Sequence, residues 1–457
     1  MPAETPKALA EQGDLNLTQL GRSYRDSLGG RVRELVEEDA RYFLHQALST
    51  PVMSALQSAS GATIVDADGR PLLDMHGNGV HNAGFNNPAV KDAVRRQLDR
   101  DMTFCPRRFT NREAVELARA LVEAAPDGLS RCLFCPGGSE AVEMSLALAK
   151  LVTRRFKTVS FWNSFHGAGF AASSVSGEEH FTGGFGPMMP GALKVEFPDY
   201  YRNPWGFSDP ADVDAECLRQ MELVMSREGS IAAVIGEPVS ATPCVPSIAY
   251  WEGVSALCRK HGALLIFDEI IEGFGRTGKL FACEHFVTPD VLVLGKSLGG
   301  GLLPFAGIVA REELNAAAHR SVGHYTHEKN SLCCAAALAG LQYLIENDIP
   351  GHAARLGAYC LERLEDMRGR HPLIGNVTGL GLHLGIDLVR DRKTKERAVT
   401  EAEAVMYASL ERGVSFKIID QSVITLRPAL VITQEEMDRA LDVLDESIGD
   451  IERINQY

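Results

Sequence analysis

Residues 291–301 read VLVLGKSLGGG, a run of aliphatic residues that ends in a single lysine and then in glycines. An ammonium group at the end of a buried strand is costly unless it is paired or hydrogen-bonded. Gly299, Gly300 and Gly301 allow a tight turn that lies close to a ligand. Lys296 alone therefore has two interpretations. It is a strand-end lysine that reaches solvent, or it is a partly desolvated amine that attacks a carbonyl carbon and forms a Schiff base.

The chain around this stretch alternates apolar runs with amphipathic segments. The runs that we predict as strands include RCLFCP (131–136), IAAVIGEPV (231–239), ALLIFDEI (263–270) and VLVLGKS (291–297). Near-continuous apolar strands that alternate with helices are typical of an α/β fold with a parallel sheet covered on both faces. We expect FAGIVA (305–310) to be an antiparallel strand at the sheet edge, and GFGRTGKLFA (273–282) to be a mobile glycine-rich loop.

Both ends of the chain are expected to contribute to a second, smaller α+β domain. GATIVDADGRPLLDMHG (61–77) reads as a β-hairpin, and the last helix begins with the capping-box pair Thr433 and Glu436. Thr110 and Glu113 have the same spacing before an earlier helix. We predict three segments: residues 1–75 as an N-terminal arm and part of the small domain, 76–328 as the large domain, and 329–457 as the C-terminal small domain. Residues 1–20 are expected to be a loose arm.

Charge and hydropathy exclude several classes of partner. The chain has 457 residues, with 46 basic and 60 acidic side chains and a formal net charge of −14, which argues against nucleic acid or an anionic membrane as a partner. It has no apolar run of membrane-spanning length, and the N-terminus lacks a signal peptide pattern. Ten scattered cysteines favour a reduced, cytoplasmic setting. Cys132 and Cys135 form one Cys-x-x-Cys pair without a second pair at zinc spacing, so buried core cysteines are expected and a metal site is not.

Two loops that follow predicted strands have features of a cofactor site. Gly137 and Gly138 precede Ser139 at the start of a helix, where backbone N–H groups and a hydroxyl favour an anion such as phosphate. An ordinary strand-to-helix turn has the same pattern. Phe165 and His166 follow another strand and offer an aromatic face and a polar ring to a planar ligand, although Phe165 alone would also suit a core.

Asp268 ends the apolar run LLIFD, at the position where strand ends meet ligands in open α/β sheets. A carboxylate there can hold a protonated ring nitrogen, or it can cap a loop. The sequence thus contains four features of a cofactor site: a helix start suited to phosphate, an aromatic face, a carboxylate and the strand-end Lys296. These are the four groups that pyridoxal phosphate requires.

At this point the chain resembles the class-III (omega) aminotransferases, which are fold-type I pyridoxal-phosphate enzymes. The stretches DEIIEGFGRTGKLFA (268–282) and VLVLGKSLGGGLLPFAGIVA (291–310) carry the resemblance, which extends over most of the chain. It implies a large domain with a mostly parallel seven-stranded sheet flanked by helices, a small domain built from both chain ends, and a homodimer with active sites at the interface.

The resemblance also implies the roles of individual residues. Lys296 is expected to form the Schiff base, and Asp268 to pair with the pyridine nitrogen. The remaining cofactor contacts that it implies are Gly138 and Ser139 at the phosphate, Phe165 with His166 on one side of the ring, Ile270 on the other side, Glu237 near the substrate, and Thr326 reaching the phosphate of a partner subunit.

The sequence departs from the family beside the cofactor and where the substrate is expected. Gly137 stands in place of a serine or asparagine, and Ile271 in place of a glutamine. HYTHEKNSL (324–332) replaces a Thr-Phe-Gly-Gly-Asn-Pro stretch, so bulky or charged side chains occupy positions 327–329. His327 and Lys329 either face solvent or the partner subunit, or they belong to a rebuilt pocket for an anionic group such as phosphate or phosphonate.

Four further residues are candidates for substrate contacts. Arg107 and Arg108 suit oxyanions, and Arg427 lies where the family often holds an arginine for a substrate carboxylate. His76 is a further candidate, although packing of its loop would explain it as well. A surface role would also explain the two adjacent arginines.

The predicted function is pyridoxal-phosphate-dependent amino transfer from a primary amine or amino acid to a keto acid or aldehyde. The alternative is an ammonia-lyase or phospho-lyase that acts on a small phosphorylated or phosphonated amino alcohol. A racemase or aminomutase is less favoured, and a non-catalytic protein is disfavoured because Lys296 and Asp268 are both present.

Overall fold

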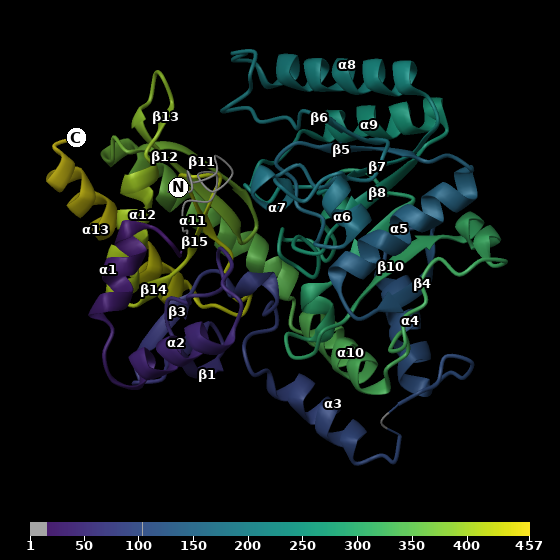
Figure 1. Ribbon diagram of the computed structural model, residues 1–457, viewed down its shortest axis with the longest axis horizontal. Coiled ribbons are helices and arrows are strands. Elements are labelled where there is room, and N and C mark those ends of the chain that lie inside the picture. Colours follow the sequence, from purple (N-terminus) through teal and green to yellow (C-terminus); the bar gives the residue numbers. More distant parts are fainter. Residues whose placement is uncertain (1–15, 103) are drawn as a thin grey trace. The chain divides into compact units, whose positions relative to one another are not determined.

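The computed structural model of the protein describes residues 16–102 and 104–457, so most of the predicted N-terminal arm lies outside the described residues. Within these ranges the chain forms two units (Figure 1). The small unit contains the residues up to 79, residues 84–86 and residues 355–457, and the large unit contains residues 80–83 and 87–354. The second boundary lies beyond the predicted 328/329, because α10 (Ser331–Glu346) packs on α3 (Pro88–Leu98) and α4 (Arg112–Ala124) of the large unit.

A mostly parallel sheet of seven strands forms the centre of the large unit, as predicted. Its strands are β4 (Leu129–Cys135), β5 (Lys157–Phe161), β6 (Ala192–Val195), β7 (Ile231–Gly236), β8 (Leu264–Asp268), β9 (Val291–Leu294) and β10 (Ala306–Arg311). Their order is β4-β10-β9-β8-β7-β5-β6, and only β10 runs antiparallel to its neighbours. The prediction that β10 is an edge strand is wrong, because β4 pairs with its outer side and takes the edge. The short connection from β9 contains no crossover helix, which explains the antiparallel pairing.

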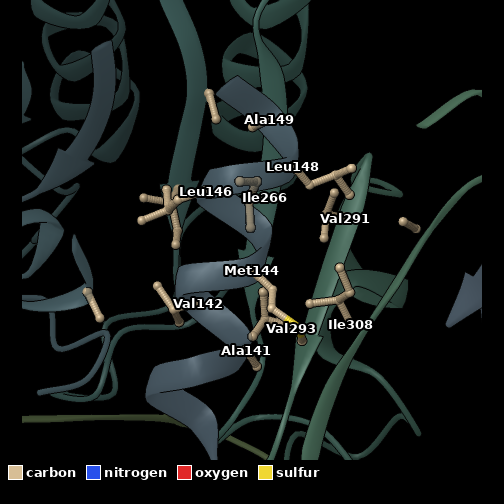
Figure 2. Packing of buried hydrophobic residues seen from close by; sticks show 14 of the residues in the cluster. Ala141, Val142, Met144, Leu146, Leu148, Ala149, Ile266, Val291, Val293 and Ile308 are labelled. Carbon is tan, nitrogen blue, oxygen red and sulfur yellow. The ribbon is translucent and has the colours of Figure 1, made fainter. Parts of the chain in front are cut away.

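Helices cover both faces of this sheet. Ile266 and Phe267 are adjacent in β8 and therefore point to opposite faces. Ile266 packs with residues of α5 (Gly138–Thr153), while the Phe267 ring lies 4.7 Å from that of Trp251 in α9 (Ile248–His261). Figure 2 shows Met144 and Leu148 of α5 packed toward Val291, Val293 and Ile308 of the neighbouring strands. The apolar strands are therefore buried on both faces, as their sequences predict.

The other helices of the large unit include α8, which runs beside α9 in Figure 1. They are α6 (Phe170–Val175), α7 (Glu179–Thr182), α8 (Pro210–Glu228) and the 3-10 helices η3 (Ala282–His285), η4 (Lys296–Gly299) and η5 (Glu312–Ala317). The N-cap of α4 is Asn111 and not Thr110, since the Asn111 side chain accepts a 2.8 Å hydrogen bond from the Ala114 N–H.

The small unit is α+β and combines residues from both parts of the chain. One sheet has the order β1-β2-β3-β14, and the other has the order β11-β12-β16-β15 with β13 beside β12. The strands are β1 (Leu56–Ser60), β2 (Thr63–Asp66), β3 (Pro71–Asp74), β11 (Ile374–Leu380), β12 (His383–Asp391), β13 (Glu396–Arg397), β14 (Val414–Ser415), β15 (Lys417–Ile419) and β16 (Val423–Leu426). The predicted hairpin is confirmed as the antiparallel pair β2 and β3.

The helices of the small unit are α1 (Gln19–Ser27), α2 (Gly30–Tyr42), the 3-10 helix η2 (Gly77–Gly79), α12 (Val399–Glu411) and α13 (Gln434–Asn455), and α11 (Ile349–Arg370) crosses the boundary. The capping box of α13 is confirmed, with the Thr433 side chain accepting from the Glu436 N–H. Of the helices in residues 16–102 and 104–457, none is both long and apolar enough to cross a membrane.

Candidate functional site

A cavity of about 190 Å³ lies where five strands of the large unit end. Its lining residues follow the carboxyl ends of β4, β5, β7, β8 and β9, which is where open α/β sheets bind ligands. The lining consists of Gly138, Ser139, Phe165, His166, Gly167, Glu237, Asp268, Ile270, Ile271, Glu272 and Lys296. The structure therefore brings together every cofactor-site residue that we predicted from the sequence, with the exception of Thr326.

Lys296 stands at the start of η4, directly after β9. Its backbone has a φ of +43°, in the left-handed region that residues other than glycine seldom adopt. The preceding Gly295 is needed for space, because a Cβ there would lie 3.2 Å from Ile270 Cγ1. Such strain persists only where the surrounding structure enforces it, and it is common at functional sites. The tight turn therefore holds the half-buried lysine at the cavity wall.

Asp268 and His166 form a buried pair on the cavity wall. His166 Nδ1 lies 2.7 Å from Asp268 Oδ2, and the backbone N–H of Ile270 donates to Asp268 Oδ1 at 3.1 Å. Burial tends to lower the pKa of His166, but the hydrogen bond and negative charge of Asp268 outweigh it and raise the pKa above its usual range. His166 thus orients the carboxylate and compensates its charge, a pairing that we did not predict.

The start of α5 forms the other wall of the cavity. The N-cap residue Gly137 provides no side-chain hydrogen bond to the first turn, so its backbone N–H groups are not capped by a side chain. A Cβ on Gly138 would lie 2.8 Å from Ile270 Cδ1, and one on Gly167 would lie 2.5 Å from Ser139 Oγ. The Ser139 hydroxyl accepts a 3.0 Å hydrogen bond from the Ala168 N–H. These glycines bring the two loops close together at the cavity wall.

Three glutamates are buried around the end of β8, and we did not predict two of them. Glu237 Oε2 accepts a hydrogen bond from the Ala241 N–H at 3.1 Å. Glu269 accepts from the N–H groups of Ala282 and Cys283 at 2.6 and 2.7 Å, and burial raises its pKa to about 7. Glu272 is 1% exposed and lines the cavity. The sequence contains a signal for it, since a glutamate between Ile271 and Gly273 interrupts an apolar, glycine-rich segment.

The turn that carries Glu272 is held by hydrogen bonds. Asn82 Nδ2 donates to the carbonyl oxygens of Gly273 and Phe274 at 3.1 and 3.0 Å, and Arg276 Nη2 donates to Asn82 Oδ1 at 2.7 Å. Residues 273–277 are buried. The prediction of a mobile loop over 273–282 is therefore wrong for residues 273–277, because the glycines there allow close packing.

The residues predicted to bind an anion lie elsewhere in the large unit. Arg107 contacts His324, and its Nε lies 3.5 Å from Glu328 Oε2. Glu328 and Lys329 line a different cavity of about 210 Å³, and the Phe104 ring packs edge-on against the His327 ring at 5.4 Å. Thr326, His327 and Arg108 are exposed. Within one chain, therefore, Arg107, Arg108, Thr326, His327 and Lys329 do not line the Lys296 cavity.

The last two substrate candidates belong to the small unit. His76 lines a cavity of about 400 Å³ in that unit, together with Asp74 and Lys417. Arg427 is buried, and its backbone N–H donates to the Met75 carbonyl at 2.6 Å. Their contribution to a substrate site stays a prediction.

Cys132 and Cys135 lie three residues apart in β4, so their side chains point to opposite faces of the sheet. Burial raises the pKa of both thiols to about 12. A thiol that resists ionisation is a poor nucleophile and a poor metal ligand, which is consistent with two structural cysteines.

Comparisons with known proteins agree with this geometry. The family model for class-III aminotransferases matches residues 45–448. The (R)-1-hydroxy-2-aminoethylphosphonate ammonia-lyase of Vibrio splendidus is 39% identical over 98% of this chain and 96% of its own. The leucine/methionine racemase of Thermococcus litoralis is 33% identical over 92% of this chain and 96% of its own. An amine transaminase from an uncultivated Pseudomonas species, solved in its PLP-bound form, superposes with a TM-score of 0.85 at 31% identity over 90% of this chain and 98% of its own.

Proposed function

The chain belongs to the class-III aminotransferase family, and from that premise we propose that it is a pyridoxal-phosphate-dependent ammonia-lyase. Its proposed substrate is a small primary amine with a hydroxyl on the neighbouring carbon and a phosphonate or phosphate group. The observation that carries this proposal is the 39% identity with the Vibrio splendidus lyase over nearly the full length of both chains. Elimination of ammonia, the alternative that the sequence left open, is thus favoured over amino transfer.

The residues of the Lys296 cavity fit pyridoxal phosphate. Ser139 and the uncapped N–H groups of α5 suit its phosphate, and the buried carboxylate of Asp268 suits its protonated ring nitrogen. Phe165 and Ile270 would lie on the two sides of the ring. The cavity also contains one amine, that of Lys296, as the attachment of the aldehyde requires.

When bound, pyridoxal phosphate withdraws electrons from the carbon that carries the substrate amine, which makes the hydrogen on that carbon acidic. The amine of Lys296, which lines the same cavity and is the group that attaches the cofactor, takes that proton. Asp268 would face the ring nitrogen, and His166 holds its Oδ2 at 2.7 Å. His166 and Ile270 fix the direction of this carboxylate, so both act as positioning residues.

We place the anionic end of the substrate near a second copy of the chain. Thr326 and His327 are exposed and, in a single chain, lie outside the cavity lining, as does Lys329. We propose a homodimer in which Thr326 of one protomer reaches the cofactor phosphate of its partner, and in which Lys329 contributes positive charge for a phosphonate. Arg107 is less suited to this task alone, because Glu328 offsets its charge. A cytoplasmic location is proposed from the ten free cysteines.

Amino transfer is the second candidate, favoured by the TM-score of 0.85 with a solved amine transaminase. Racemisation is the third candidate, because the racemase of Thermococcus litoralis is 33% identical to this chain. All three reactions begin with the same proton transfer to Lys296, so they differ in what happens next to the neighbouring carbon.

The substrate panel that tests the proposal contains 1-hydroxy-2-aminoethylphosphonate, the same compound without its hydroxyl, and an uncharged amino alcohol. We expect ammonia and the corresponding aldehyde from the first compound, no ammonia from the second, and a much higher KM for the third. Two observations together would establish amino transfer instead. The compound without the hydroxyl would be converted only when a keto acid is added, and the hydroxylated compound would release no ammonia.

A further inference from the structure

Glu272 is a buried acid in the cavity to which the reaction so far gives no role. It is 1% exposed and lines the cavity beside Lys296. Among the described residues neither Oε1 nor Oε2 has a hydrogen-bond partner other than the amide of Glu272 itself. Buried polar atoms are nearly always paired. An unpaired carboxyl on a cavity wall therefore indicates a group that interacts with what the cavity binds.

The neighbouring carboxyl groups differ from Glu272 in this respect. Asp268 accepts from His166 and Ile270, and Glu237 accepts from the Ala241 N–H. Glu269 accepts from two backbone N–H groups of η3. Each of these three carboxyl groups accepts a hydrogen bond from another residue. Glu272 differs from all three, because neither of its oxygens does so among the residues that the structure describes.

The surroundings of Glu272 favour its neutral form. Burial raises the pKa of Glu272 well above its usual range, and the negative charges of Glu237 and Asp268 raise it further, while Lys296 has a smaller opposing effect. His166 donates to Asp268 through Nδ1 and makes no hydrogen bond to Glu272. These surroundings thus favour the protonated carboxylic acid, which can donate a proton.

We propose that Glu272 is the general acid that protonates the departing hydroxyl group of the substrate. This inference rests on the proposed lyase function, because only that reaction expels a hydroxyl from the carbon next to the amine-bearing carbon. Hydroxide is a poor leaving group, and a positioned acid that converts it to water typically accelerates such a step by about 10²- to 10⁴-fold.

The proton and electron balance of this step is complete. Lys296 takes the proton from the carbon that bears nitrogen, and the electron pair of that C–H bond forms a carbon–carbon double bond. The bond between the neighbouring carbon and its hydroxyl oxygen breaks, and the oxygen takes the proton of Glu272 and leaves as water. Glu272 is then a carboxylate. The released enamine tautomerises to an imine, and one water hydrolyses it to an aldehyde and ammonia.

The fold also fixes the position of this acid. Asn82 holds the carbonyl groups of Gly273 and Phe274, the two residues after Glu272, and Arg276 holds Asn82. A general acid must meet the leaving atom at hydrogen-bond distance, so a braced turn is better suited to carry it than a free loop.

The test compares Glu272→Gln with the matched control Glu252→Gln, which makes the same change at an exposed position of α9. Each protein, loaded with pyridoxal phosphate, receives 1-hydroxy-2-aminoethylphosphonate and the analogue in which chloride replaces the hydroxyl. Chloride leaves without a proton. We expect E272Q to lose at least about 100-fold in ammonia release from the hydroxyl compound and far less from the chloride compound, while E252Q follows the wild type on both.

A second readout needs no turnover. The infrared carbonyl band of protonated, water-excluded carboxylic acids in the cofactor-free wild type at neutral pH should lose intensity in E272Q, while Glu269, whose pKa burial raises to about 7, contributes to the band in both proteins. Cofactor absorption by E272Q shows that the variant is folded and loaded.

The possible outcomes separate the two proposals. If the wild type releases no ammonia from the hydroxyl compound, the lyase function falls and the role of Glu272 falls with it. If the wild type releases ammonia and E272Q loses the same factor on both leaving groups, or loses nothing, only the role of Glu272 is refuted. An infrared band that keeps its full intensity in E272Q would likewise refute it.

Discussion

The buried pair of His166 and Asp268 leads to a prediction about stability that depends on pH. Replacing His166 by phenylalanine keeps a flat ring of similar shape but leaves Asp268 Oδ2 without its 2.7 Å partner. The two side chains are 0% and 4% exposed, and breaking a buried ion pair by removing one partner typically costs about 3–5 kcal/mol. We expect a loss of that size in the free energy of unfolding at pH 6.

The pH dependence follows from the direction of the pKa shift. The pKa of His166 is raised above 6.5 in the folded protein. Its contribution to stability is therefore fully present below the unfolded value of 6.5 and is lost as pH rises through the folded value. The difference between the wild type and His166→Phe should accordingly shrink between pH 6 and pH 9.

Urea unfolding of the cofactor-free proteins at several pH values measures this difference. His285→Phe is the matched control, because burial lowers the pKa of His285 and its Nε2 lies 3.1 Å from the Thr277 carbonyl. Its effect should have the opposite pH dependence, with the wild type losing relative stability as pH falls. A difference for His166→Phe that stays constant or grows from pH 6 to pH 9 would refute an ionised pair.

Three further substitutions test the cavity. Lys296→Ala should abolish the visible absorption that pyridoxal phosphate acquires on attachment, and persistence of that absorption would contradict the assigned role. Gly138→Ala should weaken pyridoxal phosphate binding about tenfold, because its Cβ would lie 2.8 Å from Ile270 Cδ1 and overpacking costs about 1–3 kcal/mol; adding Ile270→Val removes that atom and should restore binding. Lys329→Ala should raise KM for amines that carry a phosphonate but not for uncharged amines, and an equal rise for both would exclude an anion site.

Much of the fold and part of the cavity follow from local sequence patterns. Apolar runs such as LLIFD predict buried parallel strands, and parallel strands bring the residues at their carboxyl ends to one edge. For that reason Asp268, Lys296 and Ser139 could be predicted to lie together. The motifs of a known family then assigned their roles.

Other features depend on contacts that local patterns do not encode. The pairing of His166 with Asp268 joins two loops that are far apart in the sequence. The edge position of β4 depends on the pairing of β10 with both β9 and β4. The helix α10 belongs to the large unit because it packs on α3 and α4. Glu272 escaped prediction because it precedes a glycine-rich segment that reads as a mobile loop, whereas the turn is buried and held by Asn82.

The central claim is that the carbon–oxygen bond next to the amine-bearing carbon breaks and the amine leaves as ammonia. The most direct test incubates the loaded protein with 1-hydroxy-2-aminoethylphosphonate alone, without any keto acid, and counts ammonia released per bound cofactor. We expect many ammonia molecules per cofactor and no accumulation of pyridoxamine phosphate. One equivalent of pyridoxamine phosphate with no ammonia would contradict it.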